Sequence, residues 1–376
     1  MSSAKASGVA TKLNKNYGYK KQQANCYPNQ CAASPNQFMQ QKPILVIIRP
    51  IVVGILLTSA AFSDPLTGQM IARSSGVITI GGTPHPYLAE GTGPTCIVVG
   101  LAPSYPPLLS DRLKQRIRFV YVDFKNSWNA ESADAAGKTT MDSLVDEIDQ
   151  VRSGLGLEKV ILFGHSGPAL VAVEYTLRHP DRVSQLVLVS VEPYFTPDWL
   201  KARAAFWETD ASADRKGALK RNVERFPDDL LRRLSPRDAF ALRYVRNGPK
   251  YFYDPSYDFY WAFAGKHFSA EVISYFFNTI VANYDPRSRL TKNTVPTFLA
   301  LGRYDYNIPY REWDSTRKTT PHLTTHIFER SGHFPMIEEQ DQFDSALLDW
   351  LAHSASSQVD RKPASGSEQV ATAIGH

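Results

Sequence analysis

The chain has 376 residues, of which 43% are hydrophobic, and its formal net charge is +5. This length is sufficient for a buried parallel sheet with helices on both faces. The positive charge does not indicate nucleic-acid binding, because the seven Lys and Arg residues before Asp64 account for it and leave the remainder at −2. The sequence contains no His-Glu-x-x-His motif and no paired cysteine spacing of a metal site, so we expect no metal and no cofactor.

The beginning of the chain divides into two stretches. Residues 1–43 are rich in Lys, Asn, Gln and Ser without periodicity, which predicts disorder. Residues 44–62 are nearly all apolar but are interrupted by Arg49-Pro50, and three interpretations stay open. The stretch is a signal sequence of an exported protein, an anchor that associates with a membrane, or an extension of a cytoplasmic protein whose true start is near Met70.

The segment Val160–Leu170 predicts a sharp turn from a strand into a helix. An apolar, partly β-branched run leads into Gly164-His165-Ser166-Gly167 and then into a helix-forming run. Such a turn holds the Ser166 hydroxyl above the sheet, with the amide of Gly167 directed at the same reacting atom. The alternative is an ordinary helix start with Ser166 as its N-cap.

Two later strands end in side chains that would complement a nucleophilic serine. Residues 295–305 predict a buried strand followed by Asp305, and residues 326–335 predict a strand followed by His333. In an open α/β sheet, catalytic groups collect at the carboxyl ends of the strands. Asp305 is also of the type that forms an Asx turn. If Asp305 only forms such a turn, the alternative acid is Glu192, which follows the preceding predicted strand at residues 183–191.

Together these segments resemble the α/β-hydrolase superfamily, in its proline iminopeptidase-like and esterase-like branch. The resemblance implies an α/β fold with a mostly parallel sheet and helices on both faces. Residues 71–192 and 289–352 would form this core, and residues 193–288 a helical cap inserted into it. We expect residues 353–376, which are polar and rich in Ser and Ala, to be a disordered tail.

The resemblance also implies a catalytic triad, because the chain order serine, acid, histidine is the order of this family. The matching residues are Ser166, Asp305 and His333. The oxyanion hole would consist of the backbone amides of Leu101 and Gly167. Two departures from the family pattern are Pro168, where a second elbow glycine is usual, and Val99–Pro103, which lacks the usual His-Gly.

The implied activity is hydrolysis of a carboxylic ester or small amide through an acyl-enzyme. The aromatic-rich cap favours a small substrate with an apolar or aromatic group. An aminopeptidase is the second candidate, with Glu208 or Glu224 of the cap holding a free amino group, and a non-catalytic ligand-binding protein on the same fold is the third. We interpret the basic residues of the cap, among them Arg203 and Arg215, as an ordinary solvated helix face.

Overall fold

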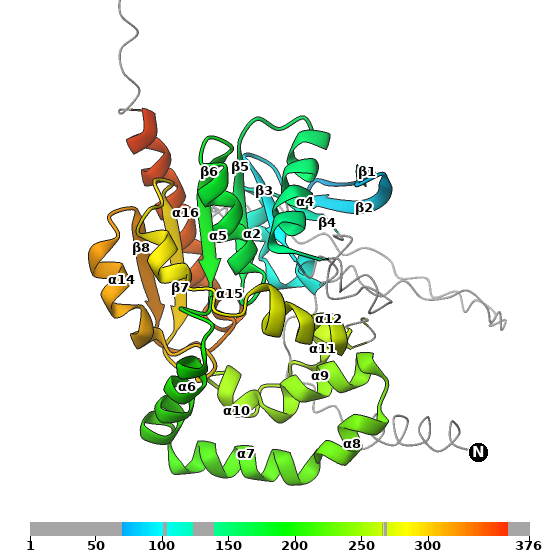
Figure 1. Ribbon diagram of the computed structural model, residues 1–376, viewed down its shortest axis with the longest axis vertical. Coiled ribbons are helices and arrows are strands. Elements are labelled where there is room, and N and C mark those ends of the chain that lie inside the picture. Colours follow the sequence, from blue (N-terminus) through cyan, green and yellow to red (C-terminus); the bar gives the residue numbers. More distant parts are fainter. Residues whose placement is uncertain (1–69, 101–103, 123–138, 265, 267–268, 360–376) are drawn as a thin grey trace, which may run out of the picture. The chain divides into compact units, whose positions relative to one another are not determined.

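One mixed sheet of eight strands organises the part of the chain that the computed structural model describes, residues 70–100, 104–122, 139–264, 266 and 269–359. All of these residues except Met70 belong to one unit, Ile71–His376. In chain order the strands are β1 (Arg73–Ile80), β2 (Thr83–Glu90), β3 (Thr95–Val99), β4 (Arg118–Val122), β5 (Val160–His165), β6 (Val183–Val189), β7 (Thr297–Gly302) and β8 (Leu323–Phe328). Across the sheet their order is β1-β2-β4-β3-β5-β6-β7-β8 (Figure 1). This arrangement confirms the predicted α/β fold.

Four sequence expectations concern residues that the structure does not describe. They are the disordered segment 1–43, the apolar segment 44–62, the oxyanion donor Leu101 and most of the tail, 360–376. Within the described residues, no helix combines the length and the apolar character that crossing a bilayer requires.

The sheet starts with an antiparallel hairpin and continues with parallel strands. Gly81 and Gly82 join β1 to β2, and their φ angles of 55° and 79° suit a tight hairpin turn. β2 pairs antiparallel with β4, and the remaining neighbours from β4 to β8 are parallel. Every residue of β5 and of β7 is buried, as is usual for strands covered on both faces. Because β5 to β8 are parallel, their carboxyl ends lie along one edge of the sheet.

Helices cover the two faces of this sheet. On one face α4 (Met141–Gly154) packs against α5 (Ala169–Arg178), and α5 also contacts β3, β5 and β6. On the other face α2 (Asp111–Lys114) packs against α16 (Gln340–Val359), which contacts β6 (Figure 1). α14 (Asp314–Thr319) connects β7 to β8. The elements that carry Ser166, Asp305 and His333 are therefore supported from both sides.

The last helix corrects the expected start of the tail. α16 continues to Val359, so residues 353–359 are helical and the expected boundary at residue 353 is wrong. The composition that favours disorder here also contains Ala and Gln, which are good helix formers. Tertiary contacts add to this propensity, because the Gln185 amide donates to the Leu351 carbonyl at 3.0 Å and to the Ser354 hydroxyl at 2.8 Å.

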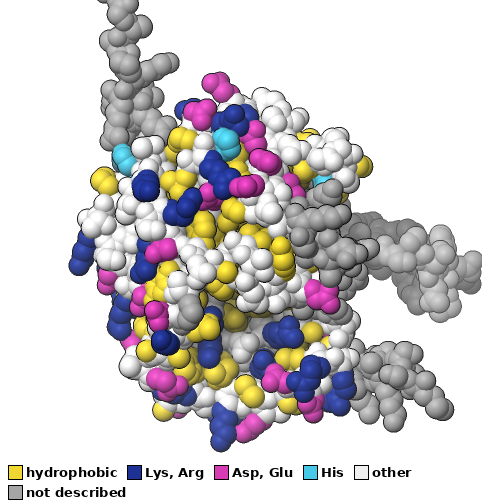
Figure 2. Space-filling model, viewed as in Figure 1, with side chains coloured by type: hydrophobic (Ala, Val, Ile, Leu, Met, Phe, Trp, Pro, Cys, Tyr) yellow, Lys and Arg dark blue, Asp and Glu magenta, His cyan; other side chains and the backbone are white. Residues whose placement is uncertain are grey.

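The segment between β6 and β7 forms a helical cap beyond the carboxyl ends of the strands (Figure 1). Its helices are α6 (Pro197–Asp210), α7 (Ala213–Arg225), α8 (Asp228–Arg233), α9 (Pro236–Arg246), α10 (Gly248–Tyr251), α11 (Tyr260–Phe263), α12 (Ala270–Tyr275), the π-helical turn η3 (Phe276–Ile280) and α13 (Pro286–Leu290). Aromatic rings fasten the cap to the sheet domain: Phe334 lies 4.3 Å from Phe259 and 5.5 Å from Phe252, between ring centroids. On the face shown in Figure 2, a hollow separates the cap from the sheet domain, with hydrophobic side chains inside it and Lys or Arg side chains on its border.

Candidate active site

Ser166 occupies the strained turn that its sequence context predicts. It follows β5 directly, and its φ angle of 56° is rare for a residue other than glycine. Its backbone N–H donates to the Val189 carbonyl at 2.9 Å, which joins the turn to β6. Gly164 makes the turn sterically feasible, because a Cβ atom there would lie 2.5 Å from the Cα atom of Ala169.

Pro168 replaces a glycine of the family pattern without disturbing the turn. It is the N-cap of α5 with φ −56°, and the N–H that it lacks would have no partner at a helix start. Its ring packs against Gly100, where a Cβ atom would lie 2.7 Å from the proline ring carbons and where φ is 78°. The proline therefore requires glycine at position 100, directly before the undescribed residues 101–103.

The expected oxyanion donor Gly167 has a free backbone N–H within the described part of the chain. Gly167 is buried, and its N–H makes no hydrogen bond with any described residue, whereas its carbonyl accepts from the Leu170 N–H at 3.0 Å. A buried N–H without a partner costs free energy, so such a group marks a place for a bound acceptor. The structure does not describe Leu101, so the second expected donor stays a prediction.

Asp305 contacts His333 through one carboxylate oxygen and a backbone turn through the other. Oδ2 lies 2.6 Å from Nδ1 of His333, and both side chains are buried. Oδ1 accepts the backbone N–H groups of Asn307 and Ile308, each at 2.9 Å. The two sequence interpretations of Asp305 are therefore compatible, because the Asx turn holds the carboxylate against the imidazole.

Two consecutive glutamates hold the loop that carries His333: Glu338, the last residue of α15 (Pro335–Glu338), and Glu339 directly after it. Glu338 accepts the backbone N–H groups of Gly332 at 2.9 Å, Phe334 at 3.3 Å and the cap residue Tyr253 at 2.7 Å. Glu339 accepts from the Arg330 N–H and the Ser331 hydroxyl. Burial raises the pKa of Glu338 to about 7, against the lowering effect of these backbone donors. The sequence holds no signal for this clamp, because a Glu-Glu pair after a loop has no distinctive pattern.

His165 lies behind His333 and contacts its backbone. Nε2 of His165 is 2.9 Å from the His333 carbonyl oxygen, and Nδ1 is 2.9 Å from the Tyr105 hydroxyl. A carbonyl only accepts, so Nε2 carries the proton and Nδ1 accepts from Tyr105. Burial lowers the pKa of His165 well below its usual range, with a further contribution from the neighbouring His333. We conclude that His165 is a neutral, fixed support for the histidine loop.

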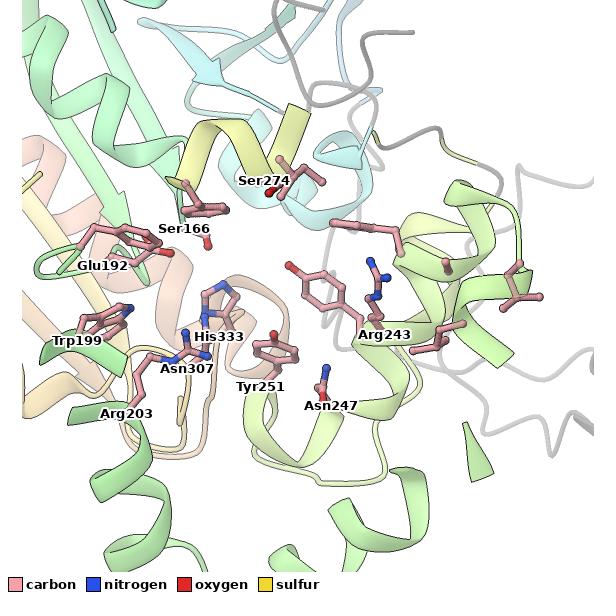
Figure 3. A pocket seen from close by; sticks show the side chains of 18 of the residues that line it. Ser166, Glu192, Trp199, Arg203, Arg243, Asn247, Tyr251, Ser274, Asn307 and His333 are labelled. Carbon is pink, nitrogen blue, oxygen red and sulfur yellow. The ribbon is translucent and has the colours of Figure 1, made fainter. Parts of the chain in front are cut away.

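Ser166 and His333 open into a cavity of about 600 Å³ between the sheet domain and the cap. In Figure 3 the Ser166 hydroxyl is directed towards the His333 ring. Cap residues supply most of the other walls: Phe195, Trp199, Arg203, Leu231, Arg232, Leu234, Ala239, Phe240, Arg243, Tyr244, Asn247, Tyr251, Ile273, Ser274 and Phe277. The arrangement joins a serine, an imidazole and a buried carboxylate at the inner end of a largely apolar pocket.

Glu192, the alternative acid, lines this cavity but does not contact His333 Nδ1, which Asp305 occupies. Glu192 is buried, and its Oε2 atom has no hydrogen-bond partner among the described residues. Burial raises its pKa to about 7, and the nearby His333 and Arg203 oppose that effect. Among the described residues, no group of three His, Cys, Asp or Glu side chains is placed to hold a metal ion.

The charged residues of the cap differ from the sequence interpretation in four places. Glu208 and Glu224, the candidates for holding an amino group, do not line the cavity, and Glu208 is exposed and paired with Lys216 at 2.9 Å. The assignment of Arg203 and Arg215 to a solvated helix face is wrong. Arg203 lines the cavity, and Arg215 is buried and donates to three backbone carbonyls of the cap. Helical spacing cannot reveal these positions, because they depend on how the cap helices pack.

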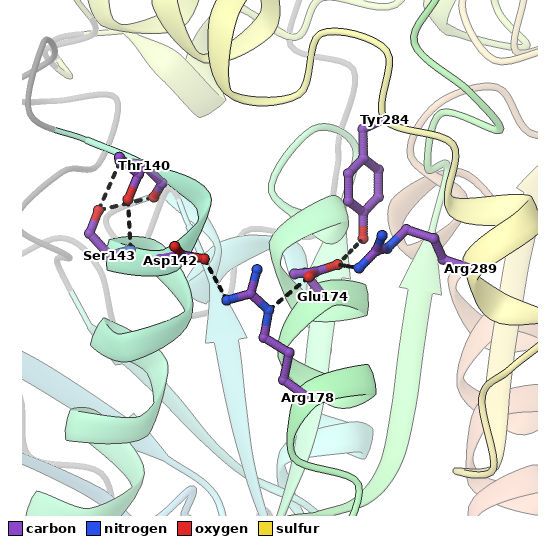
Figure 4. Close-up of polar contacts among 7 residues, drawn as sticks. All are labelled: Thr140, Asp142, Ser143, Glu174, Arg178, Tyr284 and Arg289. Carbon is purple, nitrogen blue, oxygen red and sulfur yellow. Dashed lines mark hydrogen bonds and ion pairs between the residues drawn. The ribbon is translucent and has the colours of Figure 1, made fainter.

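The helix after Ser166 is fastened by a buried carboxylate (Figure 4). Glu174 of α5 accepts from Arg178 Nε at 2.7 Å and from the Tyr284 hydroxyl at 2.9 Å, and it pairs with Arg289 of α13. Arg178 also reaches Asp142 of α4 at 2.6 Å. Burial raises the pKa of Glu174, but these donors outweigh it and the net shift is downward. The network connects the Ser166 helix with α4 and with the segment that leads into β7.

Comparison with known proteins agrees with this architecture. The family model described as alpha/beta hydrolase fold matches residues 99–340. The chain is 31% identical over 266 residues to the AB hydrolase superfamily protein YclE of Bacillus subtilis, covering 70% of this chain and 94% of that protein. It is 26% identical over 306 residues to a proline iminopeptidase of Heyndrickxia coagulans, covering 72% and 91%.

A solved structure supports the same fold. An alpha/beta fold family hydrolase from Bacillus anthracis superposes with a TM-score of 0.57 at 17% identity, covering 75% of this chain and all of that one. At 17% identity this likeness shows the fold alone. Membership of the family is shown by the family model and by the sequence relatives. The chain is therefore a hydrolase that belongs to the α/β-hydrolase superfamily.

Proposed function

We propose that this protein is a serine hydrolase that cleaves a carboxylic ester or small amide through an acyl-enzyme intermediate. The observation that carries the proposal is the 2.6 Å contact between Asp305 and His333 on the wall of a cavity that Ser166 shares. Ser166 adds a second feature, since its positive φ angle is the strain expected of a nucleophile held out from a sheet.

Each group has a distinct role in the proposed reaction. His333 accepts the proton of the Ser166 hydroxyl as the oxygen attacks the substrate carbonyl, and Asp305 keeps the imidazole proton on Nδ1. The Gly167 amide, together with the expected Leu101 amide, donates to the oxyanion that develops on the carbonyl. His333 then protonates the leaving alcohol or amine, and water attacks the acyl-serine by the same steps in reverse. Each oxyanion donor is expected to lower the barrier by about 3–4 kcal/mol.

The cavity favours an ester over the free amino terminus of an aminopeptidase substrate. One relative is a proline iminopeptidase, so we keep aminopeptidase activity as the second candidate. A substrate ammonium group needs carboxylates, and the described lining has Glu192 as its only acid beside three arginines, Arg203, Arg232 and Arg243. Like charges in a pocket of low polarity repel a cationic substrate.

The decisive experiment measures hydrolysis and active-site labelling together. Wild-type protein should hydrolyse short-chain nitrophenyl esters faster than proline or alanine anilides, and a fluorophosphonate probe should label Ser166. Ser166→Ala should abolish both while the protein stays folded. Ser274 lines the same cavity and accepts a hydrogen bond from Asn278, so Ser274→Ala is the matched control. The probe should label this variant to the same extent as the wild type. Faster cleavage of the anilides would instead establish the aminopeptidase.

The same labelling separates an enzyme from a ligand-binding protein, because reaction with the probe requires an activated nucleophile. Absence of labelling and of turnover in the folded wild type would mean that the fold serves to bind a ligand.

A further inference from the structure

Two arginines in the cavity have no anionic partner among the described residues. Arg203 of α6 lies with its guanidinium carbon 5.7 Å from the centroid of the Trp199 ring, and Arg243 belongs to α9. Neither guanidinium makes a hydrogen bond or ion pair with a described side chain or backbone group. Figure 3 shows Arg203 on the Trp199 side of the cavity and Arg243 beyond Tyr251 on the other side.

Other charged groups of the lining do not neutralise this pair. Arg232 also lines the cavity, but Asp229 pairs with it at 2.5 Å. Glu192, the only acid of the described lining, forms no ion pair with either Arg203 or Arg243. Each side of the pocket therefore holds an arginine without an ion pair to a described residue, although the charge of Arg203 acts on the buried Glu192 carboxyl.

Much of the remaining lining is apolar. Its hydrophobic side chains include Phe195, Trp199, Leu234, Phe240, Ile273 and Phe277, beside the polar Tyr244, Asn247, Tyr251, Ser274 and Asn307. A hydrocarbon or aromatic group gains free energy by leaving water for such a surface. Arg203 is half-buried, so its guanidinium is less well solvated than one in water, whereas Arg243 is exposed. A ligand carboxylate that pairs with a guanidinium through two parallel N–H···O bonds binds strongly.

From this combination we propose that the cavity selects an ester that has an apolar body and a carboxylate remote from the scissile bond, and that this carboxylate pairs with one of the two arginines, Arg203 or Arg243, on its own side of the cavity. The inference rests on the proposed serine hydrolase function and adds the substrate class to it.

The test compares substrates of equal length and different terminal charge. Nitrophenyl monoesters of dicarboxylic acids, in a series of increasing chain length, are measured beside nitrophenyl esters of the corresponding monocarboxylic acids and of acids with a terminal amine. At the preferred length, kcat/KM should be at least about tenfold higher for the carboxylate than for the neutral ester. The terminal amine should be the poorest of the three.

Arginine variants then assign the preference to one of the two side chains. Either Arg203→Gln or Arg243→Gln should reduce the ratio of charged to neutral kcat/KM by about tenfold, mainly through KM, and the double variant should show the same reduction. The charge-retaining variants Arg203→Lys and Arg243→Lys should keep part of the ratio, which a purely structural role would not do. The matched control is Arg221→Gln, at an exposed position of α7 away from the cavity, and its ratio should equal that of the wild type.

The outcomes separate this inference from the function on which it rests. If the wild type hydrolyses neutral esters through Ser166 but shows no preference for the carboxylate, or prefers the amine, the substrate class is wrong and the hydrolase stands. A preference that survives the double glutamine variant also overturns the inference. If no ester is turned over by Ser166, the proposed function itself fails.

Discussion

The backbone oxygen of His333 lies 2.9 Å from Nε2 of His165, the residue directly before Ser166. The elbow therefore supports the proposed base as well as the proposed nucleophile, because one neutral imidazole joins the end of β5 to the histidine loop. Tyr105 completes the support by donating to the other ring nitrogen.

Replacing His165 should impair turnover more than binding. In His165→Ala the His333 carbonyl and the Tyr105 hydroxyl lose a buried partner, and the base can shift relative to Ser166. We expect kcat on a nitrophenyl ester to fall by roughly 10- to 100-fold with little change in KM. His165→Gln, which restores an N–H donor, should recover part of kcat. An unchanged kcat in His165→Ala would show that this contact does not position the base.

Removing the carboxylate of Glu338 should loosen the His333 loop. Glu338→Gln has one acceptor oxygen for three backbone N–H groups, so we expect the free energy of unfolding to fall by about 1–3 kcal/mol, with a lower kcat. Urea denaturation and ester kinetics measure the two effects. Glu329→Gln, a change in an exposed pair with Arg303, is the control and should alter stability by less than about 1 kcal/mol. Equal effects of the two substitutions would contradict the clamp.

Glu192 should make the protein less stable as the pH rises. Burial raises its pKa from 4.5 to about 7, so the unfolded chain loses this proton first. The free energy of unfolding therefore falls between about pH 4.5 and pH 7 and then levels off, by at most about 3 kcal/mol. Glu192→Gln should be more stable than the wild type at pH 8 and similar to it at pH 4.

Urea denaturation at these two pH values measures that difference. The control is Glu208→Gln at the exposed surface of the cap, which should change stability by less than about 0.5 kcal/mol at both. A Glu192→Gln variant that differs equally from the wild type at pH 4 and pH 8 would contradict the interpretation.

The stability that the ion-pair network on α5 contributes should change with pH in the opposite direction to the contribution of Glu192. The donors around Glu174 lower its pKa below 4.5 despite burial, so its contribution is present above about pH 4.5 and is lost as the pH falls further. Glu174→Ala should therefore destabilise the protein by roughly 2–3 kcal/mol at pH 7, because it leaves Arg178 and Arg289 without their shared partner. The difference in free energy of unfolding between Glu174→Ala and the wild type should shrink below pH 4. A constant difference in urea midpoints would assign the effect to packing alone.

Local patterns in the sequence were enough to predict the fold and the candidate triad. Glycine at position 164, the apolar run before Ser166 and the strand ends before Asp305 and His333 are features of single segments. The strong tendency of parallel strands to place their carboxyl ends at one edge then brings those segments together. For this reason the sequence alone pairs Asp305 with His333, the two residues that the structure joins at 2.6 Å.

Other properties depend on how distant segments pack, and the sequence contains no periodic signal for them. Only the tertiary structure decided that Asp305 serves a turn and an imidazole at once, that Glu338 holds the histidine loop, and that α16 continues to Val359. The same holds for Arg203, which sequence spacing places on a solvated face and cap packing turns into the cavity. By itself the sequence determined which side chains stand at the strand ends, since these positions follow from neighbouring residues in the chain. The charge and shape of the pocket arise where the cap helices meet the sheet, so they depend on three-dimensional contacts.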